Sequence, residues 1–219
     1  MRLEQLCAAP HLDAIARTSP RNNYVAEFLS LRAAPDILEA VNPLGKRAVK
    51  EITESMAVVR RLRGLVLAEP NKYVFYDLCA GNALTSVIAA HLLPIKEAVA
   101  IDKRPRERNW GRVNKFSYVC EDINRIRPDY FADSSIIIGV HACRNRAEKV
   151  IRHYLESEAS HLVLMPCCSG KLSKGYLFPG VLDNYQSWSM QLAHMAGGTV
   201  NIDFGILSPK NAIITASKV

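Results

Sequence analysis

The sequence predicts an α/β fold: a doubly wound, mostly parallel sheet of seven strands, with an antiparallel C-terminal hairpin and a helical N-terminal extension. After residue 70, short apolar runs alternate with helical segments, as in a parallel sheet covered on both faces. Only the turn Ser208-Pro209-Lys210-Asn211 separates the last two runs, so these strands must pair antiparallel. Before residue 70, apolar residues recur at helical spacing.

The helical extension is predicted over residues 1–68. Helical spacing covers Tyr24–Leu31, Asp36–Val41 and a long stretch from about Lys46 to Leu67. The long stretch needs a surface to pack on, and we expect the extension to cover the ligand site or to help bind substrate. The boundary falls at Glu69-Pro70-Asn71, which gives an α/β domain over residues 69–219. The apolar stripe of the long stretch consists of Val49, Ile52, Met56, Val59, Leu62 and Val66.

Seven strands and five helices are predicted within the α/β domain. Gly197-Gly198 ends the last helix, because glycine freely adopts the left-handed conformation of a helix C-cap. The predicted strands are Tyr73–Leu78, Ala98–Ile101, Phe116–Cys120, Ser135–Val140, His161–Met165, Thr199–Phe204 and Ala212–Ala216. The predicted helices lie near Leu84–Leu92, Arg106–Val113, Ile123–Phe131, Ala147–Ser157 and Asp183–Ala196.

The composition favours a globular protein of the cytoplasm. Of 219 residues, 49% are hydrophobic and 22% are charged, enough for a full core without disulfides or a structural metal. No apolar run approaches the ~18 residues of a membrane span, and Glu4 stands where a secretion signal is apolar. Six scattered cysteines in a chain of this size favour reduced thiols. We therefore expect a soluble, unexported protein without membrane partners.

The first strand of the domain ends in a loop that suits S-adenosylmethionine better than a dinucleotide. The loop Cys79-Ala80-Gly81-Asn82-Ala83 keeps one glycine of a dinucleotide fingerprint, and the Asp77 carboxylate would repel a pyrophosphate. Asp77 suits the ammonium group of S-adenosylmethionine instead. The backbone amides of Ala80, Gly81 and Asn82, at the start of a helix, attract the carboxylate of the same cofactor.

Two more acids follow the next two strands. Asp102, with Lys103 beside it, ends the second strand, where a carboxylate can accept both ribose hydroxyls. Asp122 follows the third strand, where the adenine amino group would arrive, and Ile123 can cover the ring. Each acid alone can equally be a turn or helix-cap residue. Three acids at three successive strand ends nevertheless predict one pocket for S-adenosylmethionine.

Three short motifs resemble class I S-adenosylmethionine-dependent methyltransferases. Asp77-Leu78-Cys79-Ala80-Gly81, His141-Ala142-Cys143 and Pro166-Cys167-Cys168 are similar to one branch of this family. That branch includes the tRNA 2′-O-methyltransferase that acts in the acceptor stem. In it a His-x-Cys follows the fourth strand and a Cys-Cys follows the fifth. The resemblance covers about Lys46–Val219.

The helix before the first motif also resembles this branch. Lys46, Lys50 and Glu51 are similar to the lysines and glutamate of the corresponding helix there. The chain departs from the branch at Arg144-Asn145-Arg146-Ala147, where those relatives often carry Thr-Asp. The resemblance implies a Rossmann-like methyltransferase fold, S-adenosylmethionine as cofactor and RNA, such as tRNA or rRNA, as substrate.

His141, Cys143 and Cys167 are the candidate catalytic residues, because they follow the fourth and fifth strands beside the expected methyl donor. His141 can orient or deprotonate a nucleophile, or simply bond a loop carbonyl. The cysteines, with Cys168, can pack as small apolar residues, attack a base as thiolates or hold zinc. Because the Cys-x2-Cys spacing of a structural zinc site is missing, no metal is predicted.

Positive charge favours a polyanionic partner. The net charge is +7, and basic residues gather in Lys103–Lys115, Arg60–Arg63 and Arg144–Arg152. Such groups can contact RNA phosphates without sequence preference, although solvated helix faces would look the same. The candidates for stacking an unpaired base are Trp110, Tyr176 and Phe178.

The predicted function is therefore methyl transfer from S-adenosylmethionine to RNA. A small-molecule or protein methyltransferase would use the same cofactor pocket and is one alternative. A non-catalytic RNA-binding or metal-binding protein on the same fold is the other. The sequence makes no prediction of the oligomeric state.

Overall fold

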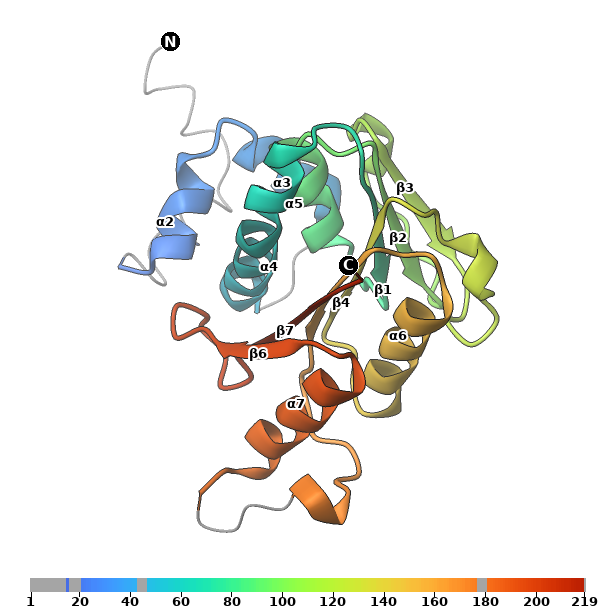
Figure 1. Ribbon diagram of the computed structural model, residues 1–219. Coiled ribbons are helices and arrows are strands. Elements are labelled where there is room, and N and C mark those ends of the chain that lie inside the picture. Colours follow the sequence, from blue (N-terminus) through green and yellow to red (C-terminus); the bar gives the residue numbers. More distant parts are fainter. Residues whose placement is uncertain (1–14, 16–20, 43–46, 177–180, 219) are drawn as a thin grey trace.

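A single seven-stranded sheet organises the computed structural model, which describes residues 15, 21–42, 47–176 and 181–218 (Figure 1). The strand order is β3-β2-β1-β4-β5-β7-β6. Strands β1 to β5 pair in parallel, whereas β7 pairs antiparallel with both β5 and β6. The predicted fold class and C-terminal hairpin are confirmed. The strands are β1 (Val74–Leu78), β2 (Glu97–Asp102), β3 (Phe116–Cys120), β4 (Ser135–Val140), β5 (His161–Met165), β6 (Thr199–Ile202) and β7 (Ala212–Ser217).

Helices cover both faces of the sheet. The central strand β4 shows why: Ile136 and Ile138 belong to the core under one helical layer, and Ile137 to the core under the other. Helices α2 (Asn23–Ser30), α3 (Ala34–Val41), α4 (Ala48–Ala68) and α5 (Leu84–Leu92) form the first layer. Helices α6 (Asn145–Glu156) and α7 (Asn184–Met195) form the second (Figure 1). Within the described ranges, no helix is long and apolar enough to cross a membrane.

The long helix α4 buries the apolar stripe that the sequence predicts. Of its apolar stripe, all members except Val49 are buried, against α5 and α2. The Ser55 and Thr85 hydroxyls, 2.9 Å apart, add a polar contact between α4 and α5. Lys46, which the sequence analysis places near the start of this helix, lies outside the described residues, as does Phe178. This packing brings one face of α4 to the edge of the sheet where β1 and β4 end.

The segment between β2 and β3 is not the helix predicted over Arg106–Val113. Only the 3-10 turn η2 (Trp110–Arg112) forms. Arg108 and Arg112 would stack like charges four residues apart on a helix, and Gly111 has low helix propensity. The basic run therefore lies in an extended loop beside the carboxyl end of β2.

The helix predicted over Ile123–Phe131 is also wrong. The 3-10 turn η3 (Pro128–Tyr130) is what remains of it. Pro128 cannot stand inside a helix, because it lacks the N–H donor and its ring collides with the preceding turn. The Asp122 side chain also bonds the Asn124 N–H at 2.9 Å, which closes a local turn instead.

Strand β6 ends at Ile202, two residues before the predicted Phe204. Asp203 starts a turn there, with its Oδ1 accepting from the Gly205 N–H at 2.9 Å, and Phe204 is 90% exposed. The N-terminal extension fastens to this turn, because the Tyr24 hydroxyl donates to Asp203 Oδ2 at 2.6 Å. The extension therefore contacts the C-terminal hairpin as well as the face of the sheet.

Candidate active site

A cavity of about 700 Å³ opens at the carboxyl edge of the sheet. It lies where the chain order reverses between β1 and β4, the place where open α/β sheets bind ligands. Ten of the predicted site residues line it: Asp77, Cys79, Ala80, Gly81, Asn82, Asp102, Lys103, Asp122, Ile123 and His141. Helix α4 closes one side with Glu51, Glu54 and Ser55.

The β1–α5 loop is shaped by three residues with left-handed backbone. Cys79, Gly81 and Ala83 have φ values of 63°, 59° and 61°, which costs little at glycine and more at the other two. Side chains hold the strained turn in place. Asn82 Oδ1 accepts from the Leu84 N–H at 3.1 Å at the start of α5, and its Nδ2 donates to Glu51 Oε2 at 3.0 Å.

Asp77 presents an unsatisfied carboxylate oxygen at the cavity. The side chain is 2% exposed. Its Oδ2 accepts from the Ser86 hydroxyl at 2.8 Å, but within the described part of the chain no group bonds its buried Oδ1. Burial raises the pKa of Asp77 to about 7. The hydrogen bond from Ser86 opposes this rise, and the negative charge of Asp102 adds to it. A cationic ligand group would satisfy both the orphaned oxygen and the charge, so the site fits an ammonium.

Asp102 is already engaged. Its carboxylate accepts from the Gly81 N–H at 3.0 Å, from the Arg104 N–H at 3.0 Å and from Arg104 Nε at 3.1 Å. Burial alone would raise the pKa of Asp102, but these bonds outweigh it and lower the pKa below its usual value. The Arg104 side chain, 61% exposed, is a partner that the sequence analysis missed. A ribose diol at Asp102 must therefore compete with a guanidinium.

The third strand end supplies a less buried acid. Asp122 Oδ1 accepts from the N–H and the Nδ2 of Asn124, both at 2.9 Å, and the backbone bond from Asn124 is the main cause of its lowered pKa. The neighbouring Ile123 is 7% exposed, and its carbonyl lies 2.9 Å from His153 Nε2. Asp122 therefore has the turn role that the sequence analysis gives as the alternative to ligand binding, and it also lines the cavity.

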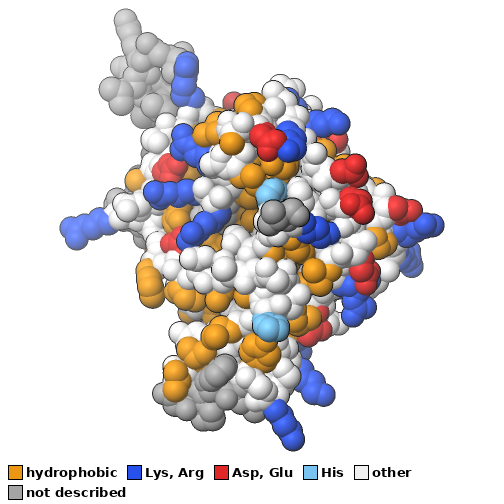
Figure 2. Space-filling model, in the orientation of Figure 1, with side chains coloured by type: hydrophobic (Ala, Val, Ile, Leu, Met, Phe, Trp, Pro, Cys, Tyr) orange, Lys and Arg blue, Asp and Glu red, His pale blue; other side chains and the backbone are white. Residues whose placement is uncertain are grey.

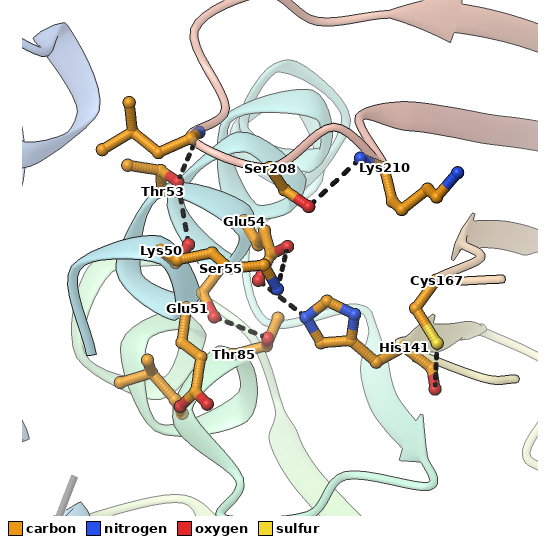
Figure 3. Close-up of polar contacts among 12 residues, drawn as sticks. Lys50, Glu51, Thr53, Glu54, Ser55, Thr85, His141, Cys167, Ser208 and Lys210 are labelled. Carbon is orange, nitrogen blue, oxygen red and sulfur yellow. Dashed lines mark hydrogen bonds and ion pairs between the residues drawn. The ribbon is translucent and has the colours of Figure 1, made fainter. Parts of the chain in front are cut away.

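Another side of the cavity is built around His141 and a buried glutamate (Figure 3). His141 Nε2 lies 2.6 Å from Glu54 Oε2, and Lys50 Nζ lies 2.8 Å from Glu54 Oε1. The Glu54 side chain has no solvent exposure, whereas that of His141 is 31% exposed. Sequence analysis missed Glu54. The sequence did carry one signal: Glu54 is the one charged residue in Ile52–Val59.

The candidate cysteines lie behind His141. A disulfide joins Cys143 and Cys167, whereas the sequence analysis expects reduced thiols; the loops after the adjacent strands β4 and β5 bring together two residues 24 positions apart. Neither cysteine is among the residues that line the cavity. In this oxidised state neither sulfur can be a nucleophile, because only a thiolate attacks. The free Cys168 lies with both, all three sulfurs being within 4.8 Å of one another.

Basic residues form the outer wall of the cavity. Arg106 and Arg108 are half-buried there, and in the described part of the chain nothing accepts a hydrogen bond from the buried Nε atom of either one. On the face drawn in Figure 2, basic side chains are interspersed with acidic ones, so charge alone does not single out a surface. The basic side chains that line the cavity are Lys103, Arg104, Arg106, Arg108, Arg146 and Lys149.

The other residues predicted to contact nucleic acid either lie outside the cavity or already pack against other side chains. Arg60, Arg61 and Arg63 are exposed on α4 but do not line the cavity. Trp110 stacks on Tyr118 at 4.2 Å between ring centroids, so that face of the indole is not free for a base. Tyr176 contacts His194 edge-on. Only two of the three predicted basic groups therefore reach the candidate site.

Comparisons with known proteins agree with this fold. A family model described as a methyltransferase domain matches residues 47–175, more than half of the chain. The ribosomal protein L11 methylase of Lactobacillus delbrueckii subsp. bulgaricus is 12% identical, with 80% of this chain and 82% of that one covered and a TM-score of 0.50. The precorrin-6y C5,15-methyltransferase of Geobacter metallireducens GS-15 is 18% identical, with coverages of 84% and 94% and a TM-score of 0.47. No curated protein sequence matches.

Proposed function

Because the chain belongs to the methyltransferase domain family whose model matches residues 47–175, it is a methyltransferase that uses S-adenosylmethionine, and we propose that it methylates RNA. The observation that carries this proposal is a cavity with two chemically different walls. Acids at successive strand ends form the inner wall, and basic side chains form the outer one, among them Arg106 and Arg108, whose Nε atoms have no partner among the described residues. The inner wall suits a cationic cofactor, and the outer wall suits a polyanionic substrate.

The cofactor lies along the inner wall in this proposal. When bound, S-adenosylmethionine supplies an activated methyl group. The orphaned Asp77 Oδ1 takes the ammonium group, and Asp102 takes the ribose hydroxyls in place of Arg104. Asp122 and Ile123 flank the adenine, as their position after β3 favours. The Cys79–Asn82 loop and Lys103 complete the contacts.

His141 stands on the acceptor side. It lines the same cavity as Asp77, and it is close enough for its charge to lower the pKa of Asp77. Because a methyl donor is already activated, the chain's task is to align the acceptor, exclude water and remove a proton where the acceptor carries one. His141 is the titratable side chain placed to remove it.

RNA is the substrate class that the outer wall favours. Among the described residues, the Nε atoms of Arg106 and Arg108 have no hydrogen-bond partner, so these guanidinium groups keep donor capacity for phosphate oxygens. The resemblance of the His141 and Cys167-Cys168 motifs to the acceptor-stem tRNA methyltransferase branch favours tRNA within that class.

Two measurements test the proposal. Calorimetric titration should show binding of S-adenosylmethionine and its demethylated product, and tritiated methyl groups should pass to total tRNA or rRNA. No cofactor binding at millimolar ligand would overturn the site, whereas transfer only to protein or small molecules would overturn the RNA assignment.

A pair of matched variants locates the RNA surface. Replacing Arg106 and Arg108 by Ala should raise the Kd for RNA about tenfold at low salt, because two phosphate contacts are lost. Replacing Arg61 and Arg63 by Ala removes the same charge from a helix outside the cavity and should change the Kd less than twofold. Equal losses from both pairs would show nonspecific attraction rather than a site.

A further inference from the structure

The contact between α4 and the loop after β4 joins two residues 87 positions apart. Glu54 Oε2 lies 2.6 Å from His141 Nε2, and the second ring nitrogen of His141 points away from Glu54 (Figure 3). Within the described ranges, Glu54 is the one side chain that bonds this ring. The imidazole therefore has one end fixed by a buried carboxylate and the other end free.

Burying a carboxylate is costly unless it has charged partners. The Glu54 side chain is fully buried, and two groups meet its carboxylate: the Lys50 ammonium one helical turn earlier, and the His141 ring nitrogen from the loop after β4. An ion pair at the protein surface pays a smaller desolvation cost than a buried one. This one lies at the wall of the ligand cavity, with its histidine partly exposed to that cavity.

We propose that Glu54 is a positioning residue, which holds His141 as the general base of methyl transfer while Lys50 pairs with the Glu54 carboxylate; this rests on the proposed function of the cavity. Glu54 accepts the Nε2–H of His141, so the lone pair lies on Nδ1. Nδ1 takes the proton of the acceptor as the acceptor's lone pair forms the bond to the methyl carbon and the bond from that carbon to the sulfonium breaks. The imidazolium that results is paired with the Glu54 carboxylate.

The arrangement also explains the backbone of His141. The residue has φ of 63°, a left-handed value that is uncommon outside glycine but that histidine, like asparagine and aspartate, adopts more often than other residues. Its own N–H is tied to the Met165 carbonyl at 2.9 Å. Together these contacts fix where the ring enters the cavity, and Glu54 fixes how the ring is turned.

The test variant is Glu54→Gln, which keeps the size of the side chain and removes its charge. We expect kcat to fall roughly 10- to 100-fold, with the KM for RNA and the Kd for S-adenosylmethionine changed less than twofold. Nitrogen-15 shifts of the His141 ring should show loss of the Nε2–H tautomer. Glu156→Gln, on the exposed side of α6, is the matched control and should leave all four readouts unchanged.

A double-mutant cycle separates positioning from a structural role. His141→Gln should lower kcat at least as much as Glu54→Gln, and the double variant should be no slower than His141→Gln alone. Losses that multiply, or an unchanged His141 tautomer in a folded Glu54→Gln protein, would overturn the proposal. Because the tautomer is measured without substrate, this readout stands even if RNA proves not to be the acceptor, a failure that the methylation assay reports separately.

Discussion

The two halves of the candidate site differ in how they are built. The proposed cofactor half takes its acids from residues at or next to the ends of β1, β2 and β3, so strand positions place most of it, although Asp102 also accepts from the Gly81 N–H of the loop after β1. The acceptor half joins Glu54 of α4 to His141 after β4, and Cys143 to Cys167 across two loops. Local residues can hold a cofactor common to many reactions, whereas the selective half depends on contacts between distant segments.

The largest effect is expected in the cofactor half, at Asp77. Asp77→Asn should weaken S-adenosylmethionine binding at least 100-fold, because it removes a carboxylate whose buried Oδ1 has no hydrogen-bond partner among the described residues. Calorimetric titration at pH 7 measures this loss. An unchanged Kd would show that the ammonium binds elsewhere and that the inner wall is not the cofactor site.

The pH dependence of stability gives an independent check on the same residue. Burial raises the pKa of Asp77 to about 7, so the folded protein without ligand holds a proton between pH 4 and 7 that the unfolded chain releases. The contribution of Asp77 to the free energy of unfolding is full below pH 4 and is lost as pH rises through 7, by on the order of 4 kcal/mol. Urea unfolding at pH 4.5 and 8 should show this decline in wild type and not in Asp77→Asn.

The next effect tests the acceptor half through its disulfide. Reduction of Cys143–Cys167 opens a loop of 24 residues, which should lower the free energy of unfolding by about 3 kcal/mol. Cofactor affinity should change little, because neither cysteine lines the cavity. Thermal unfolding with and without dithiothreitol measures this loss of stability. A Cys143→Ser/Cys167→Ser variant is the control and should not respond to dithiothreitol. If reduction also changed the Kd for S-adenosylmethionine, the two halves would be coupled.

The two halves also differ in how much of each could be predicted from the sequence. The strand ends and their acids were predictable, because short apolar runs that alternate with helical segments place Asp77, Asp102 and Asp122 on one edge of a parallel sheet. The helices expected around Arg106 and Pro128 were wrong, because charge repulsion and a proline outweighed the alternation that the fold class suggested. Glu54 escaped prediction because a buried contact between α4 and the loop after β4 leaves no spacing pattern along the chain, and only its isolated charge within Ile52–Val59 marks the residue.

A smaller effect sharpens the role of the second acid. Asp102→Ala should raise the Kd for S-adenosylmethionine about 10- to 100-fold, equivalent to roughly 1–3 kcal/mol for a lost charged hydrogen-bond acceptor. The Gly81 N–H, which Asp102 also holds, loses its partner in this variant. Asp102→Asn keeps that acceptor and should lose less. If both variants bind the cofactor as wild type does, the ribose lies outside the end of β2.

The smallest effect concerns Arg104, the residue at which the cofactor half meets the basic wall. Its guanidinium bonds Asp102 at 3.1 Å and is 61% exposed, so little holds it there besides the ion pair. Arg104→Met removes a competitor for the carboxylate that the ribose needs, and the Kd for S-adenosylmethionine should fall two- to fivefold. The gain should shrink in 0.5 M salt, because screening already weakens the competing pair in wild type. Weaker binding in Arg104→Met would mean that the arginine contacts the cofactor itself, and Asp102 would then act by holding Arg104 rather than by holding the ribose.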